Sequence, residues 1–235
     1  MKPILIGHRG ARGLAPENTL LALDAGIAAG CPWLEFDVQL HPSGHLFLLH
    51  DLTLDRSSNG KGLASACDWQ TLRSLDAGQG QHIPTLDEAL DLIDQRARVN
   101  IELKTWDGTA AAVAECLRAR IAEGCDAEQF MVSSFHLPEL YEFKQLLPQV
   151  PVAVLLCGVP LDWAACATEL QAVALNQSAE FVDARLVADA MARGLQVFVY
   201  TVNDVDEYTR LAAMGVDGVF TDLPDQLCDA VRRAE

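Results

Sequence analysis

Charged and titratable side chains gather in short groups, each beside a strand-like apolar run. The groups are His8-Arg9-Gly10, Glu35-Phe36-Asp37, His50-Asp51 and Glu102-Leu103-Lys104. Histidine transfers protons near neutral pH, and clustered carboxylates suit a hard divalent cation. Arginine and lysine are the side chains that most often bind phosphate groups. In combination, these residue types predict metal-assisted chemistry on a phosphate ester.

Eight apolar runs of strand length recur along the chain and alternate with helical patterns. The runs cover residues 4–7, 34–38, 99–103, 131–134, 152–156, 172–175, 196–201 and 218–221. Segments with apolar residues three and four apart, such as 109–122 and 137–147, lie between most of them. Eight strand–helix repeats in 235 residues favour a closed α/β fold, the (β/α)8 TIM barrel. An open, doubly wound sheet is the alternative.

One segment interrupts this alternation. The sequence His41-Pro42-Ser43-Gly44-His45 predicts a turn, and residues 46–49 predict the second arm of a hairpin. A longer polar stretch then reaches residue 83. Long excursions inside a domain are usually functional, so we expect a small insertion at about 41–83 at the catalytic end of the barrel. Because no linker or low-complexity stretch divides the chain, we predict a single domain over residues 1–235.

Strand alternation explains how the groups would converge. Residues two apart on a strand share a face, so Glu35 and Asp37 point together, as do Glu102 and Lys104. Inward side chains at the C-terminal strand ends build the active site of a TIM barrel. Buried acids need a cation, which favours a metal site over a solvated strand face. Two simpler interpretations stay open: an ion pair between Glu102 and Lys104, and a core histidine at His8.

The remaining histidines and the loop cations have simpler explanations. His41 and His45 flank the hairpin turn, His82 lies in the polar insertion, and His136 precedes a predicted helix; Arg56 and Lys61 are expected to be solvated loop charges. A glycine-rich stretch at 58–62 lacks the preceding strand and following helix of a phosphate-binding loop.

Composition limits the possible partners. The net charge of −16 opposes binding to nucleic acid or to anionic membranes, but local cations and a metal still permit an anionic substrate. Seven cysteines without a CxxC pair are typical of reduced thiols in a cytoplasm. A functional histidine at position 8 leaves no room for a signal peptide, and no apolar run reaches the roughly 18 residues of a membrane span. We therefore expect a cytoplasmic protein of unknown oligomeric state.

The order of these motifs resembles the glycerophosphodiester phosphodiesterase family, in particular its short cytosolic bacterial branch. The resemblance covers nearly the whole chain and rests on several blocks: His8-Arg9-Gly10 with Pro16-Glu17-Asn18-Thr19, Glu35-Phe36-Asp37-Val38, His50-Asp51, Glu102-Leu103-Lys104, Ser133-Ser134-Phe135, Tyr200-Thr201-Val202-Asn203, and Gly215-Val216-Asp217-Gly218 with Thr221-Asp222. It implies a (β/α)8 barrel with an insertion after the second strand. It also implies hydrolysis of glycerophosphodiesters, small-molecule substrates, to sn-glycerol 3-phosphate and an alcohol.

The same resemblance assigns roles to residues of this chain. Glu35, Asp37 and Glu102 would hold one divalent cation, Mg²⁺, Ca²⁺ or Mn²⁺. His8 and His50 would be the general acid–base pair; Arg9 and Lys104 would bind the phosphate, and Tyr200 would lie near the glycerol.

Three other functions stay open from the sequence alone. A phospholipase-type enzyme of similar barrel would act on long-chain lipids and need an apolar membrane-facing rim. A catalytically silent ligand-binding barrel would have lost a histidine or carboxylate, and none of these positions is lost. An isomerase or lyase of phosphosugars would act on monoesters.

Overall fold

The eight expected strands form one closed parallel sheet in the computed structural model, which describes residues 2–233. They are β1 (Ile4–Gly7), β2 (Trp33–Leu40), β4 (Arg98–Leu103), β5 (Phe130–Ser134), β6 (Val152–Leu156), β7 (Ala174–Ser178), β8 (Gln196–Tyr200) and β9 (Gly218–Thr221). β1 closes the ring, because Ile6 is in register with Phe220 of β9 and with Trp33 of β2. The (β/α)8 barrel is therefore confirmed, and the open sheet is excluded.

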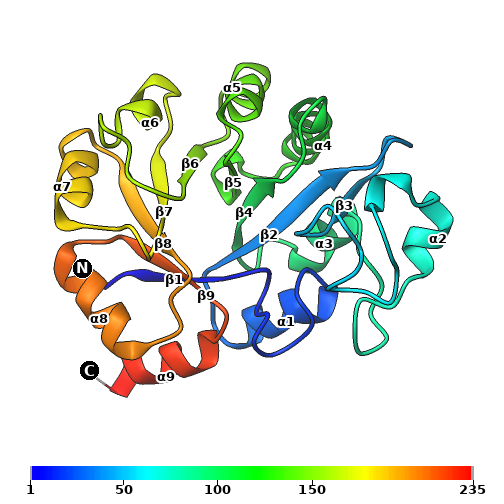
Figure 1. Cartoon of the computed structure of the whole chain (residues 1–235), viewed down its shortest axis with the longest axis horizontal. Helices are drawn as coiled ribbons and strands as arrows, with labels where there is room; N and C mark the ends of the chain where they lie inside the picture. Colours follow the sequence, from blue (N-terminus) through cyan, green and yellow to red (C-terminus); the bar gives the residue numbers. More distant parts are fainter. Residues whose placement is uncertain (1, 234–235) are drawn as a thin grey trace.

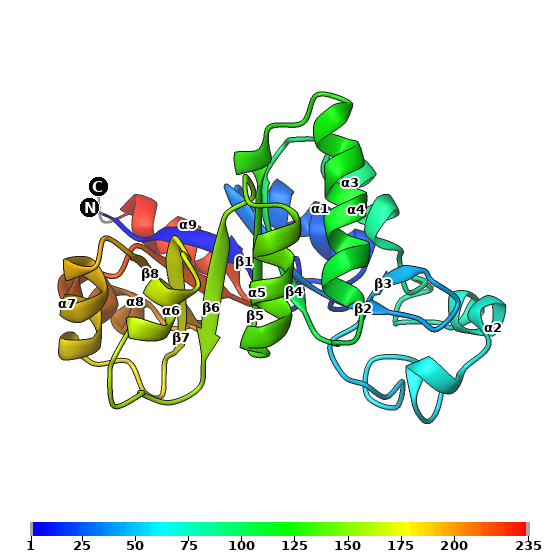
Figure 2. The same cartoon turned by 90° about the horizontal axis from the view of Figure 1, so that it is seen from above.

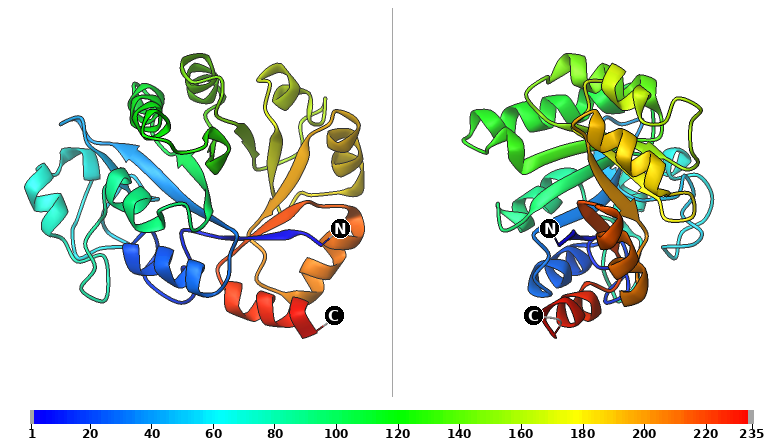
Figure 3. Two further views of the ribbon diagram at one scale, coloured as in Figure 1. Left: turned by 180° about the vertical axis from the view of Figure 1, so that it is seen from behind. Right: turned by 90° about the vertical axis from the view of Figure 1, so that its left-hand side faces the viewer.

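Helices follow the strands and lie outside the sheet (Figures 1 and 2). They are α1 (Leu20–Ala28), α3 (Leu86–Ile93), α4 (Thr109–Ala122), α5 (Leu137–Leu146), α6 (Ala165–Glu169), α7 (Ala184–Ala192), α8 (Val205–Met214) and α9 (Pro224–Arg233). Figure 3 shows α9 lying near α1, with the two chain ends on the same side of the molecule. Local signals set several helix ends: Thr85 and Glu88 form a capping box that begins α3, and Gly215 ends α8 with φ 93°.

The barrel interior has an apolar layer below a polar one. Inward side chains from six strands form the apolar layer: Ile6, Met131, Ala153, Ala174, Phe198 and Phe220. A larger cluster of Val, Leu, Ile and Ala fills the space between sheet and helices. Nearer the C-terminal strand ends, acids take inward positions on neighbouring strands, with Asp37 of β2 in register with Glu102 of β4. This register places carboxylates side by side at the mouth of the barrel.

The insertion at 41–83 leaves the barrel after β2. β3 (Leu46–Leu48) pairs with β2 in antiparallel orientation, as the hairpin prediction requires. A short 3₁₀ turn (Ala64–Ala66) and α2 (Trp69–Ser74) follow. The insertion has its own small apolar cluster, which includes Phe47, Leu54, Leu72 and Ile83. It projects from one side of the barrel (Figures 1 and 2), while the single-domain organisation stays a prediction.

The sixth strand of the barrel, β7, differs from the prediction. We expected it at 172–175, whereas β7 spans Ala174–Ser178. The apolar pattern misplaced it because its second half carries Asn176, Gln177 and Ser178, all buried. Polar residues therefore occupy a buried strand here, close to the polar mouth of the barrel.

Candidate active site

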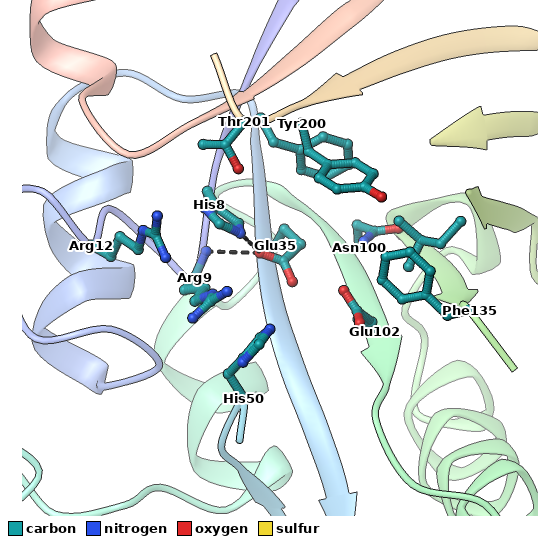
Figure 4. A pocket seen from close by; sticks show the side chains of 12 residues that line it. His8, Arg9, Arg12, Glu35, His50, Asn100, Glu102, Phe135, Tyr200 and Thr201 are labelled. Carbon is teal, nitrogen blue, oxygen red and sulfur yellow. Dashed lines mark hydrogen bonds and ion pairs between the residues drawn. The ribbon is translucent and has the colours of Figure 1, made fainter. Parts of the chain in front are cut away.

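Three carboxylates gather at the mouth of the barrel. Glu35 and Asp37 come from alternate positions of β2 and Glu102 from the adjacent β4, and one oxygen of each lies within 4.8 Å of the others. All three residues are buried, with exposed fractions of 3%, 1% and 8%. Figure 4 shows Glu35 and Glu102 extending into the same cavity. The three acids thus lie together, as alternation along β2 and β4 predicts.

Burial and mutual repulsion dominate the electrostatics of this cluster. Burial, reinforced by Asp37 and Glu102, raises the pKa of Glu35 well above its usual range. Burial, reinforced by Asp37, raises the pKa of Glu102 to about 7. The Arg9 backbone amide donates to Glu35 Oε2 (2.8 Å), but the buried Oε1 has no partner in the described part of the chain. An all-oxygen donor set with an unpaired buried oxygen fits a hard cation, so this cluster could hold a metal ion.

His8 directly follows β1 and faces the carboxylate cluster. Its Nδ1 donates to Asp222 Oδ1 at 2.6 Å, and its Nε2 lies 4.0 Å from Glu35 Oε2. Asp222 is also bound by Arg12 Nε at 2.6 Å and by Asn203 Nδ2 at 2.9 Å. Although burial opposes it, these donors hold the pKa of Asp222 well below its usual range. Burial also lowers the pKa of His8, so its neutral form is favoured with Nε2 as the free nitrogen.

His50 begins a chain of charged contacts that joins the insertion to the barrel. His50 Nδ1 donates to Asp51 Oδ1 (2.6 Å), and Arg56 Nε donates to Asp51 Oδ2 (2.7 Å). Arg56 also donates twice to Glu17 (2.7 Å each), which accepts from Arg9 Nη1 (2.7 Å). Despite burial, these arginines lower the pKa of Glu17 to about 2. Arg56 is an exposed loop charge, as expected, and it also bridges two acids, Asp51 and Glu17.

The two predicted phosphate ligands lie among the acids. Lys104 Nζ lies 2.6 Å from Glu102 Oε1 and 3.7 Å from Asp37 Oδ1, and Arg9 Nε lies 3.5 Å from Asp37 Oδ2. The ion pair between Glu102 and Lys104 therefore exists, but within the carboxylate cluster rather than apart from it. Although burial opposes it, the carboxylates raise the pKa of Lys104.

An aromatic wall closes the opposite end of the cavity. Tyr200 donates its hydroxyl to the Leu156 carbonyl at 2.8 Å, and its ring packs edge-on against Phe135 (6.0 Å) and Phe220 (6.4 Å). Burial raises the pKa of Tyr200, so its hydroxyl stays protonated. The cavity encloses about 250 Å³, with a charged end at His8, Arg9 and His50 and this apolar end (Figure 4).

All eight side chains expected at the site come together. His8, Arg9, Glu35, His50, Glu102 and Tyr200 line the cavity, and Asp37 and Lys104 contact this group from beside it. The histidines given simpler roles lie elsewhere: His41 is buried against Trp69, His45 stacks on the same ring, and His136 caps α5.

Several side chains at the site were not assigned roles from the sequence. Asp222 holds His8, Arg12 holds Asp222, and Asn18 Nδ2 donates to Asp37 Oδ2 at 2.8 Å. Asn100 and Phe135 line the cavity. A signal existed for Asp222 and Phe135, since each directly follows a strand at the C-terminal end of the barrel. Alternation along β4 could have identified Asn100, because it lies two residues before Glu102 and so shares its face of the strand.

Comparison with known proteins places this chain in a family. Residues 8–226 match the model of the glycerophosphoryl diester phosphodiesterase family. The chain belongs to this family. It is accordingly an enzyme of the phosphoric diester hydrolase class. The glycerophosphodiester phosphodiesterase of Caldanaerobacter subterraneus subsp. tengcongensis is 34% identical to it, over 99% of both chains. The enzyme of the same name from Bacillus altitudinis is 31% identical, over 94% of this chain and 95% of its own.

Solved structures of family members agree with the barrel. A phosphodiesterase from Oleispira antarctica, in complex with its product sn-glycerol-3-phosphate, superposes with a TM-score of 0.91 at 33% identity, covering 98% of this chain and 97% of its own. A structure of a glycerophosphoryl diester phosphodiesterase homologue from Silicibacter pomeroyi gives a TM-score of 0.86 at 27% identity, covering 98% of this chain and 94% of its own.

Within residues 2–233, no helix combines the length and apolarity needed to cross a membrane.

Proposed function

We propose that this family member hydrolyses glycerophosphodiesters to sn-glycerol 3-phosphate and an alcohol, with one divalent cation (Mg²⁺, Ca²⁺ or Mn²⁺) held by Glu35, Asp37 and Glu102. The observation that carries the proposal is the convergence of two aspartate-bound histidines on a buried three-carboxylate cluster in one cavity. The bound product of the Oleispira antarctica relative supports the substrate class.

The charged end of the cavity suits a phosphodiester. A divalent cation bound to the carboxylates would offset the charge of the phosphoryl oxygens and stabilise the transition state. Arg9 and Lys104 supply further positive charge beside the cluster and orient the phosphate. The aromatic end, with Tyr200, Phe135 and Phe220, provides an apolar surface for the carbon skeleton of the glycerol.

The two histidines divide the proton transfers. His8 Nε2 accepts the proton of the glycerol 2-hydroxyl, whose oxygen attacks phosphorus, while the phosphorus–oxygen bond to the alcohol breaks. Protonated His50 donates from Nε2 to the departing oxygen, which yields the alcohol and a cyclic 1,2-phosphate. Water then opens the ring: His50 takes a proton from water and His8 returns one to the glycerol O2. A tethered hydroxyl has a high effective molarity, which favours it over a free nucleophile.

Measurement of glycerol 3-phosphate release tests the activity. Purified protein is assayed on glycerophosphocholine and glycerophosphoglycerol with and without chelator. Chelation should abolish release, and divalent cation should restore it. Glu35→Gln should weaken metal binding, measured by calorimetry, while the far-UV circular dichroism spectrum is unchanged. Full activity in excess chelator would contradict the metal requirement.

A substrate analogue tests the internal nucleophile. A 2-deoxy diester lacks the attacking hydroxyl, so we expect it and simple dialkyl phosphates to turn over far more slowly than the parent at saturation. Phosphorus NMR during turnover should detect the cyclic phosphate. Equal rates without a cyclic species would indicate direct attack by water, and the histidine roles would need reassignment.

The cytoplasmic location stays a separate prediction, testable by cell fractionation.

A further inference from the structure

A second groove, of about 520 Å³, lies beside the catalytic cavity. It runs between the loop after β1 and the insertion, and Arg12 lines both hollows. The two walls meet where Gly78 approaches Pro16: a Cβ on Gly78 would lie 3.0 Å from Pro16 Cγ. The walls are also tied together by the pair between Arg56 and Glu17, both of which line the groove. The groove thus lies next to the catalytic cavity, with Arg12 as a wall residue common to both.

This groove lies beside the charged end of the cavity, where Arg12, which lines both hollows, contacts the Asp222 that holds His8. Arg56, in its wall, contacts Asp51, which holds His50. The His50 side chain is 32% exposed, whereas that of His8 is 12% exposed. In Figure 4, His50 and Thr201 lie on opposite sides of Glu35, with His8 next to Thr201. Because the aromatic end of the cavity takes the glycerol half of a diester, the alcohol half extends past the charged end toward the groove.

The chemistry of the groove favours hydroxyl groups. Its charged side chains, Arg12, Arg56, Glu17 and Asp76, carry two positive and two negative charges. Both Arg56 and Glu17 are already paired. The Asn59 Oδ1 accepts from the Asp76 amide at 3.0 Å, which leaves its Nδ2 for a ligand. None of the residues assigned to its walls has an aromatic ring, so the groove offers no cation–π contact to a quaternary ammonium group.

A third hollow, of about 250 Å³, borders the cavity on the other side. It has aromatic rings, which could attract a cationic alcohol, but these rings are partly covered. Trp106, Phe135 and His136 line it together with Lys104. Lys104 Nζ lies over the Phe135 ring, 5.7 Å from its centre, and His136 stacks on Trp106 at 5.0 Å. One face of the Trp106 ring and one face of the Phe135 ring are thus covered from within the protein, which leaves each ring less accessible to an ammonium group.

We propose that the groove between the loop after β1 and the insertion is the subsite for the leaving alcohol, and that it selects uncharged polyhydroxylated alcohols over ammonium-bearing ones. The inference rests on the proposed function and specifies its substrate class. The hydroxyl groups of such an alcohol both donate and accept, which matches a neutral wall of amide, guanidinium and carboxylate groups. Selectivity then depends on the balance of charge in the groove.

Asn59→Asp is the most direct test. The aspartate keeps an oxygen for the Asp76 amide, replaces the ligand-facing Nδ2 by oxygen, and makes the groove net negative. We measure kcat/KM for glycerophosphoglycerol, glycerophosphoinositol, glycerophosphocholine and glycerophosphoethanolamine, with the methyl diester as internal reference. Wild type should favour the two polyol diesters. Asn59→Asp should shift the choline-to-inositol ratio toward choline by about 10-fold.

Trp106→Ala is the matched control, because Trp106 lines the third hollow and should leave this ratio at the wild-type value. An unchanged ratio in Asn59→Asp, or a shifted ratio in Trp106→Ala, would overturn the assignment of the groove. A wild-type preference for choline or ethanolamine diesters would overturn the substrate class even if Asn59→Asp did not fold. Absence of hydrolysis of every diester, in contrast, would contradict the proposed function itself.

Discussion

Both histidines of the site are held in the same way, each by an aspartate that an arginine holds in turn. His8 contacts Asp222 and His50 contacts Asp51, each through Nδ1 at 2.6 Å. A carboxylate partner at Nδ1 fixes the tautomer, because only a protonated Nδ1 donates to it. Both rings therefore present Nε2 to the cavity, which is the arrangement that a pair of opposed proton transfers requires.

The first prediction concerns this pair. His8→Ala and His50→Ala should each lower kcat by at least about 10²-fold, because each removes one proton transfer. The pH dependence of kcat/KM in wild type should be bell-shaped. His45→Ala, which removes an exposed ring in the insertion, should stay near wild type. Normal turnover by His50→Ala would show that this histidine is not a catalyst.

Asp222→Asn isolates the positioning of His8. The amide is nearly isosteric but can donate to Nδ1, so it favours the wrong tautomer with Nε2 protonated. We expect kcat to fall by about 10²-fold or more with little change in KM. Asp204→Asn is the control, since Asp204 caps α8 in the next loop and asparagine caps equally well. An Asp222→Asn variant with a wild-type kcat would contradict the positioning role.

The carboxylate cluster makes stability depend on pH when no metal is bound. Folding raises the pKa of Glu35 well above its ordinary 4.5 and that of Glu102 to about 7. Above pH 4.5 these two carboxylates hold more protons in the folded state than in the unfolded chain, so their contribution to the free energy of unfolding falls as pH rises. Acids with lowered pKa, such as Glu17 at about 2, titrate below this window.

We therefore expect metal-free protein to unfold at a lower temperature at pH 8 than at pH 5. A divalent cation competes with protons for the carboxylates, so it should raise the unfolding temperature more at pH 8 than at pH 5. Differential scanning calorimetry with chelator or with Mg²⁺ or Mn²⁺ measures both effects. A cation effect that is equal at the two pH values would contradict the cluster as the binding site.

At the scale of elements, the turn between β1 and α1 depends on a close approach of the two backbones. Gly10 has φ 85°, and a Cβ there would lie 2.5 Å from the Ala22 carbonyl carbon. Gly10→Ala should therefore cost more than about 2 kcal/mol and displace His8 and Arg9, with a large loss of activity. Gly194→Ala is the control: its φ is 77° but nothing lies within 4 Å. It should cost only about 1 kcal/mol in urea denaturation, with activity retained.

Local pattern predicts the elements of this barrel but not the contacts between distant ones. The strands are short apolar runs, and alternation along β2 and β4 was enough to bring Glu35, Asp37 and Glu102 together. The predicted position of β7, 172–175, was too early in the chain because the second half of the strand is buried but polar. Asp222 lies 214 residues from His8, and their contact depends on closure of the barrel between β9 and β1. The ion pair of Arg56 with Glu17 could not be predicted in the same way, because Glu17 lies 39 residues away, on another loop.

At the scale of the whole molecule, we propose that residues 1–235 form a single domain. The insertion has its own apolar cluster, but β3 pairs with β2 and Arg56 pairs with Glu17 across the boundary. Thermal unfolding should therefore show one transition in which calorimetric and van't Hoff enthalpies agree. Two separable transitions, one of them retained after Leu72→Ala destabilises the insertion core, would show that the insertion folds independently.

The contact chain from His50 through Asp51, Arg56 and Glu17 to Arg9 limits how the insertion can be exchanged. The insertion supplies His50 and Arg56, but the acid that anchors them to the barrel belongs to a loop near the N-terminus. A chimera that receives the insertion of a relative would take residues 50 and 56 from that relative but keep Glu17 of this chain. Recombination that separates the two segments should yield folded but poorly active hybrids, unless the pair at positions 17 and 56 is transferred together.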